Sequence, residues 1–107
     1  MSAQVSYIAA EERLDITIRG NLDLSVAEEI HELCSRVPPA LSCCIVDLYE
    51  VERLFDSGVA LIRMLHRRMS EAGAIVIILT DNREIHRRLS CIAESLFPVA
   101  EAASSAG

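Results

Sequence analysis

The sequence predicts one α/β domain with a mixed, mostly parallel sheet of about five strands and three helices, in the order β-β-α-β-α-β-α-β. Two short apolar runs rich in β-branched residues, 43–48 and 74–79, alternate with segments of helical periodicity. This alternation is typical of parallel strands joined by right-handed crossovers. A length of 107 residues allows one domain, and 51% hydrophobic with 24% charged residues is a globular composition. Three helices leave room for one sheet face to be poorly covered.

The N-terminal part of the chain predicts two short strands. The first covers Tyr7 to Ala10 and the second covers Leu14 to Arg19, with Glu11-Glu12-Arg13 as the hairpin turn between them. Every other residue of the second strand is apolar, which is the period of a half-buried strand. Gly20-Asn21 is expected to end this strand.

The first helix is expected to begin at a capping box, with Ser25 as the N-cap and Glu28 at the third helical position. An apolar stripe at helical spacing follows, made by Val26, Ile30, Leu33 and Val37. Pro38-Pro39 should end the helix, because proline removes a backbone donor. The run 43–48 then indicates a central strand buried on both faces, because it is almost continuously apolar.

The second and third helices have similar start signals. Asp56-Ser57-Gly58 begins the second helix and Gly73 ends it, whereas Asp81-Asn82-Arg83-Glu84 opens the third. The apolar stripes are Val59, Ile62, Leu65, Met69 and Ala72 in the second helix, and Ile85, Leu89 and Ile92 in the third. Leu96 to Val99 is predicted as an edge strand, because Pro98 would disrupt an interior one.

Residues 1–99 are therefore expected to form the domain, and residues 100–107, which are small and polar, to fray as a C-terminal tail. The two later helices also contain an eight-residue echo. The segment Arg63 to Ser70 resembles Arg83 to Ser90 at six apolar or basic positions and at the final serine. Two amphipathic helices built alike explain the echo, and a basic face that meets an acidic partner is the alternative interpretation.

The composition excludes several classes of function. A net charge of −6 argues against a general nucleic-acid binder, which neutralises phosphates with positive charge. The longest apolar run has six residues, whereas a membrane-spanning helix needs about 20, so no membrane insertion is expected. The first residues do not have the pattern of a signal peptide, so a cytoplasmic location is expected.

The chain has no signature of an enzyme, a cofactor or a metal site. It contains no G-x-G-x-x-G, P-loop, H-E-x-x-H or G-x-S-x-G motif. His31, His66 and His86 lie in separate segments and are expected on the surface. The cysteines form no C-x-x-C pair and are interpreted as buried, reduced thiols. They are Cys34, Cys43, Cys44 and Cys91. A protein without catalysis, cofactor or metal is therefore predicted.

The segment between the central strand and the second helix is the most informative part of the sequence. It has an apolar strand that ends in Asp47-Leu48, a loop with a central Val51, and then Asp56-Ser57-Gly58 before an apolar helix. Together with Gly20-Asn21-Leu22-Asp23-Leu24 and the order of the elements, it resembles the STAS domain. This is the family of bacterial anti-sigma factor antagonists and of the cytoplasmic tails of sulfate transporters. The resemblance covers residues 5–99.

The resemblance implies a regulatory binding module. Such a protein binds an anti-sigma factor that is also a serine kinase, and thereby frees a sigma factor. The kinase phosphorylates a serine at the start of the second helix, which ends the binding, and a PP2C-type phosphatase resets the protein. The alternative implied by the same family is the STAS subunit of an ABC-type lipid transporter, which binds and stabilises the ATPase.

The family's phosphorylated serine can be placed in two ways. Counting without gaps from Asp47 puts Asp56 on the acceptor position, where it is a permanent negative charge. A shift of one residue instead puts Ser57 there, as the phosphorylation site. The partner-binding surface is expected along the second helix and the turn that precedes the first helix. Its residues are Asp23, Ser25, Asp56, Ser57, Gly58, Ile62, Arg63, His66 and Arg67.

Overall fold

The computed structural model describes residues 2–36, 40–92 and 94–96, which form one five-stranded sheet with three α-helices. The order of the strands in the sheet is their order in the chain. Strands β1 and β2 are antiparallel, and the remaining neighbours are parallel. The strands are β1 (Ser2–Ile8), β2 (Arg13–Leu22), β3 (Cys43–Leu54), β4 (Ile75–Leu79) and β5 (Glu94–Leu96). The predicted mixed, mostly parallel sheet is confirmed.

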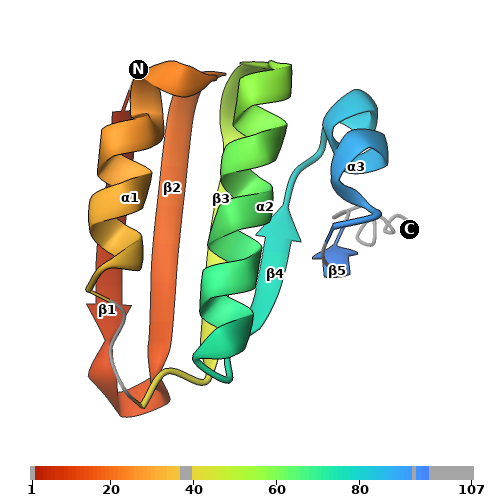
Figure 1. Ribbon diagram of the computed structural model, residues 1–107. Coiled ribbons are helices and arrows are strands. Elements are labelled where there is room, and N and C mark those ends of the chain that lie inside the picture. The colour runs from red at the N-terminus through yellow and green to blue at the C-terminus, as the bar shows by residue number, and fades with distance from the viewer. Residues whose placement is uncertain (1, 37–39, 93, 97–107) are drawn as a thin grey trace.

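The helices lie on one side of the sheet because of this strand order. Each right-handed crossover moves one strand further in the same direction, so each returns over the same face. Figure 1 shows α1 and α2 in front of the same face of the sheet. The elements are α1 (Ala27–Cys34), α2 (Asp56–Glu71) and α3 (Arg83–Leu89), with the short 3₁₀ helices η1 (Ala9–Glu11) and η2 (Leu24–Val26). Among the described elements, no helix covers the other face.

The core lies between this covered face and the helices. Alternate residues point into it along the first part of β2 and of β3, where burial follows a period of two. The side chains buried almost completely include Ile16, Ile18, Leu22, Ile30, Leu48, Ile62, Leu65, Met69, Ile78, Ile85 and Leu89. The prediction that residues 43–48 are buried on both faces is wrong. Cys43, Ile45 and Asp47 are only partly buried, because they point to the uncovered face.

Long-range pairing moves the boundaries of the first two strands away from the predicted ones. The first strand is Ser2–Ile8 rather than residues 7–10, because its whole length pairs with β2, from Ser2 opposite Arg19 to Ile8 opposite Arg13. The second strand continues through Gly20-Asn21 to Leu22. Gly20 has a positive φ of 84° there, a conformation that glycine adopts easily.

β3 extends past the predicted end at residue 48 because it remains paired with β2 as far as Leu54, through two bulges. Thr17 and Arg19 of β2 pair with Asp47 and Glu50, so β3 has one extra residue in this interval. A second extra residue follows between the partners of Gly20 and Asn21. The bulges interrupt the alternation of buried and exposed residues, so the last part of the strand has no period-two pattern.

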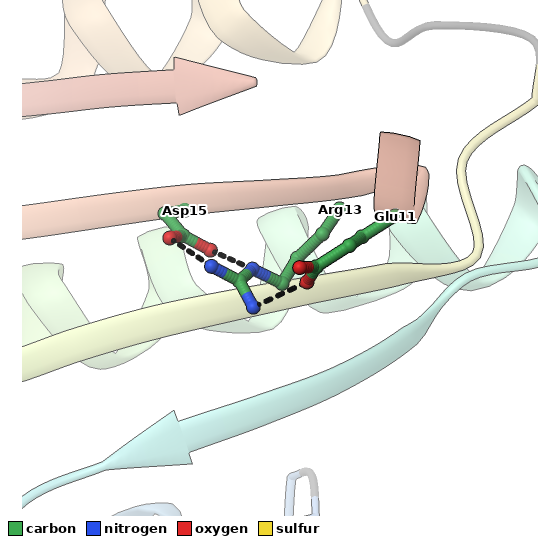
Figure 2. A network of polar contacts seen from close by, with 3 residues as sticks. All are labelled: Glu11, Arg13 and Asp15. Carbon is green, nitrogen blue, oxygen red and sulfur yellow. Dashed lines mark hydrogen bonds and ion pairs between the residues drawn. The ribbon is translucent and has the colours of Figure 1, made fainter. Parts of the chain in front are cut away.

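Charged side chains occupy the uncovered face near β2. Figure 2 shows the guanidinium of Arg13 between the carboxylates of Glu11 and Asp15, at 2.6 Å and 2.9 Å. Further along the strand, Arg19 donates to Glu50 and to Gln4. Ion pairs this exposed add little stability, but they keep this part of the face hydrated.

Several predicted features lie outside the described residues. These are Val37 and the Pro38-Pro39 stop, the part of the predicted edge strand after Leu96, and the tail 100–107. The strand at this edge is β5, at Glu94–Leu96. Within the described part of the chain, none of the helices is both long and apolar enough to span a membrane.

The four cysteines are free, and their burial differs. Cys34 and Cys44 are buried as expected, whereas Cys43 is half-buried and Cys91 is exposed, which corrects the prediction for these two. Burial raises the pKa of the Cys44 thiol to about 12, and burial also raises the pKa of Cys34. Because the thiolate is the reactive form, both buried thiols are held in their unreactive state.

We expect iodoacetamide to alkylate the native protein first at Cys91, and Cys44 only when the chain unfolds. A time course followed by peptide mass spectrometry measures the two rates. In denaturant all four cysteines should react at similar rates. Labelling of native Cys44 as fast as Cys91 contradicts the burial described above.

Candidate docking surface at the start of helix α2

The start of α2 lies where two parallel strands end together. Leu22 at the end of β2 pairs with Leu54 at the end of β3. The next residue, Phe55, donates its backbone N–H to the carbonyl of Leu22 at 3.1 Å, and it is the N-cap of α2. The chain therefore leaves the sheet and enters the helix while still bonded to β2. Carboxyl ends of parallel strands are the usual location of binding sites in α/β sheets.

Gly58 allows α2 to begin this close to β2. A Cβ atom built on Gly58 would lie 2.1 Å from the carbonyl oxygen of Leu22, far inside van der Waals contact. The first turn of the helix therefore rests directly on the backbone of the strand. Gly58 is buried, so the expectation that it contacts a partner is corrected: it positions the turn from below.

Asp56 and Ser57 form the outward part of this first turn. The side chain of Asp56 is fully exposed, and Ser57 is partly exposed, so neither is sealed beneath other side chains. The N-cap Phe55 provides no side-chain cap. The free N–H groups of the first turn are therefore available to an anion or to a partner's acceptor groups.

Asp23 and Ser25 lie in the neighbouring turn, but Ser25 does not cap α1 as predicted. Asp23 is the N-cap of η2 instead, and it accepts from the backbone N–H and the hydroxyl of Ser25, at 2.9 Å and 2.6 Å. The carboxylate, two residues earlier, reaches these donors because a short 3₁₀ turn precedes α1. The hydrogen bonds from Ser25 hold the pKa of Asp23 below its ordinary value. The hydrogen bonds to the Asp23 carboxylate therefore stabilise the folded protein at neutral pH. This stabilisation is lost as the pH falls through the lowered pKa of Asp23.

Two exposed apolar side chains accompany these polar residues, and sequence reasoning did not include them in the site. Leu24 is 68% exposed and follows Asp23. Phe55 is also exposed, with the guanidinium of Arg53 5.9 Å from its ring centre. Both residues are apolar, follow the end of a strand and belong to no apolar stripe of a helix. This combination is a sequence signal that could have identified them as exposed site residues. Leu24, Phe55, Asp56 and Ser57 are referred to below as the docking surface.

Arg88 of α3 ties the docking surface to the rest of the fold. Its guanidinium donates to the backbone carbonyl of Leu54 and to the carboxylate of Asp56. Figure 1 places α3 beside the start of α2, as this contact requires. Arg88 thus bonds the last residue of β3 and the first residue of α2 at once, and it compensates the charge of Asp56.

The sequence echo between α2 and α3 has a structural explanation. Arg68 and Arg88 occupy the same position of the repeated segment, and each donates to a backbone carbonyl at the end of a neighbouring element. Arg68 bonds the carbonyl of Cys34 at the end of α1, and Arg88 bonds that of Leu54 at the end of β3. These contacts support the interpretation of two helices built alike.

The other predicted contact residues on α2 divide into two groups. Ile62 is 1% exposed and belongs to the core, because it faces the sheet, so its predicted contact with a partner is corrected. Arg63, His66 and Arg67 line an open groove of about 500 Å³ together with Cys91 and Ile92. The structure therefore brings these three basic residues together on α2, one to three turns after the docking surface. Among the described residues, no three His, Cys, Asp or Glu side chains are arranged to hold a metal ion.

Comparison with known proteins identifies the fold. No family profile matches the chain, and no curated protein matches its sequence. The solved structure of the anti-sigma factor antagonist SpoIIAA in its unphosphorylated form is similar, with a TM-score of 0.75 and 19% identity over 95% of this chain and 94% of that one. The protein TM1081 (TM-score 0.69, 14% identity) is matched over 94% of this chain and 85% of that one. A sulfate transporter family protein from Wolinella succinogenes (0.66, 12%) is matched over 75% and 66%.

These likenesses show that the chain has the STAS fold, as its sequence predicts. The class of protein is thus a small α/β domain with all its described helices on one sheet face and a short turn at the start of α2 exposed.

Replacing Gly58 by alanine should destabilise the protein by roughly 3 kcal/mol or more, because a backbone oxygen blocks the new methyl group. Urea unfolding measures this loss. Gly73→Ala is the matched control: no atom lies within 4 Å of its Cβ, and its positive φ of 87° predicts a cost of about 1–2 kcal/mol. Equal losses for the two variants would show that α2 does not rest on β2.

Replacing Arg88 by methionine should lower the free energy of unfolding by about 1–2 kcal/mol, because the Leu54 carbonyl loses a charged donor. The exposed pair with Asp56 is expected to add little to this figure. The control is Arg87→Met, which removes only an exposed pair with Glu84 and should change stability by less than about 0.5 kcal/mol. An Arg88 variant as stable as the Arg87 variant would contradict the role of Arg88 as a clamp.

Proposed function

We propose that this chain is an anti-sigma factor antagonist that binds an anti-sigma factor with serine kinase activity through the docking surface. Phosphorylation of Ser57 then ends the binding. The observation that carries the proposal is the exposed Asp56-Ser57 turn at the start of a 16-residue helix, on a fold shared with an anti-sigma factor antagonist. A PP2C-type phosphatase resets the protein, and the whole cycle takes place in the cytoplasm. The chain itself needs no catalytic group for this role.

The docking surface has the composition of a protein interface. Leu24 and Phe55 provide exposed apolar area, which is the part of an interface that contributes most of the binding free energy. Asp23, Ser25 and Ser57 surround it with polar groups, and Arg63 and Arg67 extend it along α2 with positive charge. An anti-sigma factor with an apolar pocket and an acidic rim fits this arrangement.

Phosphorylation of Ser57 adds a charge of about −1.5 to −2 to the centre of that surface. The N–H groups at the start of α2 tolerate this charge, so the fold is expected to persist. A partner packed against the same turn must instead desolvate a dianion next to Asp56. A loss of about 2.7 kcal/mol of binding free energy already lowers the affinity a hundredfold.

The contact of Arg88 favours Ser57 over Asp56 as the switch position. Arg88 pairs with Asp56 in the unmodified protein, so the charge at that position is already compensated. A negative charge held in this way is a poor imitation of a phosphorylated serine. Ser57 is the residue of the pair whose charge can still change.

The test is to measure binding to anti-sigma kinases encoded in the same genome by isothermal titration calorimetry. Ser57→Glu should weaken binding at least a hundredfold, while Ser57→Ala should bind as the unmodified protein does but resist phosphorylation. Ser35→Glu is the matched control: it adds the same charge at an exposed serine after α1 and should bind normally. Mass spectrometry of the peptide 54–63 identifies the modified residue.

Equal binding by Ser57→Glu and the unmodified protein would remove the switch from the proposal. Binding to no kinase, together with co-purification of an ATPase subunit, would favour the second candidate function. In that case the chain is the STAS subunit of an ABC-type lipid transporter. The similarity to a sulfate transporter family protein is the observation that supports this second candidate.

A further inference from the structure

The β1 edge of the sheet lacks the features that usually protect an edge strand. Within the described part of the chain, β1 pairs with β2 alone, so its other side has unpaired backbone donors and acceptors. It is seven residues long, and its sequence, SAQVSYI, has no charged residue and no proline. Short length, charges and prolines are the usual means by which proteins prevent another strand from adding to an edge.

An apolar groove accompanies this edge on the helix-covered side of the sheet. Val5 is 46% and Tyr7 is 43% exposed, although their partners on β2, Ile16 and Leu14, are buried. With Leu33 of α1, they line an open groove of about 350 Å³. An apolar groove beside an unpaired strand edge can accept both the backbone and the side chains of an added strand.

Charged residues of the first helical segment follow the same groove. Glu29, Glu32 and Arg36 line it, so acidic groups lie within α1 and a basic group lies beyond its end. Arg36 pairs with Glu32 at an exposed site, where ion pairs are weak. Among the described residues, no ion pair involves Glu29.

We propose that a second copy of this chain docks on this edge, with β1 antiparallel to β1 of the other copy, so that two five-stranded sheets become one continuous sheet. A two-fold axis through the strand pair makes the contact self-complementary and closed. The pairing satisfies the backbone groups of both edges and covers Val5 and Tyr7 of both copies. This surface is separate from the docking surface at the start of α2.

Charge complementarity selects a second copy as the occupant. Figure 1 shows that α1 runs in the same direction as β1, so the two-fold axis that makes the strands antiparallel also makes the two α1 helices antiparallel. In the register that we propose, Glu29 of each copy lies opposite Arg36 of the other, which pairs opposite charges twice. The uncharged strand brings no like charges together, although each chain carries a net −6.

The oligomeric state of the purified chain tests this proposal by sedimentation velocity over a wide concentration range. The unmodified chain should sediment with twice the mass of one chain. With the two-fold axis at Val5, the middle residue of β1, Val5→Lys places two like charges opposite each other and should raise the dimer dissociation constant at least tenfold. Leu24→Lys is the matched control: it puts the same charge on an exposed apolar residue of the docking surface and should remain dimeric. Circular dichroism verifies that each variant is folded.

A charge exchange on the α1 segment gives a second measurement, which leaves the sequence of β1 unchanged. Arg36→Glu should weaken the dimer, and adding Glu29→Arg to it should restore the dimer by recreating the pair in the opposite sense. A chain that stays monomeric at every concentration overturns the proposal. So does a dimer that persists in folded Val5→Lys, because its contact would then lie elsewhere.

Discussion

The carbonyl group of Leu22 is the point on which the geometry of the docking surface depends. It ends β2, accepts the backbone N–H of Phe55 and lies directly beneath Gly58. These contacts hold the start of α2 against the sheet on both sides of Asp56 and Ser57. The two residues are therefore fixed in position although they are exposed. Only glycine fits above a carbonyl at this distance. The close packing of Gly58 on the Leu22 carbonyl, beneath the surface, therefore positions the polar turn.

The same turn is bonded from the other side by Arg88. A single guanidinium joins the end of β3, the start of α2 and α3, which is a short helix of seven residues. Arg68 repeats this arrangement between α2 and the end of α1. Arginine suits the role because its planar group has several donors in fixed directions and remains charged at every physiological pH. The same arginine of a repeated sequence pattern thus connects neighbouring elements in both helices, whereas the preceding arginines, Arg67 and Arg87, are exposed.

The order of the strands decides which surfaces of the molecule remain available. Because every crossover moves in one direction, the described helices share one face and the sheet has two true edges. The uncovered face is charged near β2 and apolar on β4, where Ile75 is 63% exposed. The β1 edge is uncharged and has its own apolar groove. In a domain this small, surface that the helices cannot cover is a large fraction of the whole, and it is there that contacts with other chains can form.

The sequence by itself determined the order of the elements, the mixed sheet, most of the apolar stripes and the turn at Asp56-Ser57, because local periodicity and helix-start residues are properties of short segments. It also indicated the STAS fold, since two motifs and the element order agree. Only the tertiary structure decided how long β1 and β3 are, because pairing with β2 and the bulges in β3 leave no local pattern. It also decided that Ile62 and Gly58 lie beneath the surface, that Asp23 caps the turn, and that Leu24, Phe55 and Arg88 belong to the site. Apart from the Asp23 cap, which bonds Ser25 two residues further on, these features depend on residues distant in the chain, so the proximity exists only after the sheet and the helices have packed.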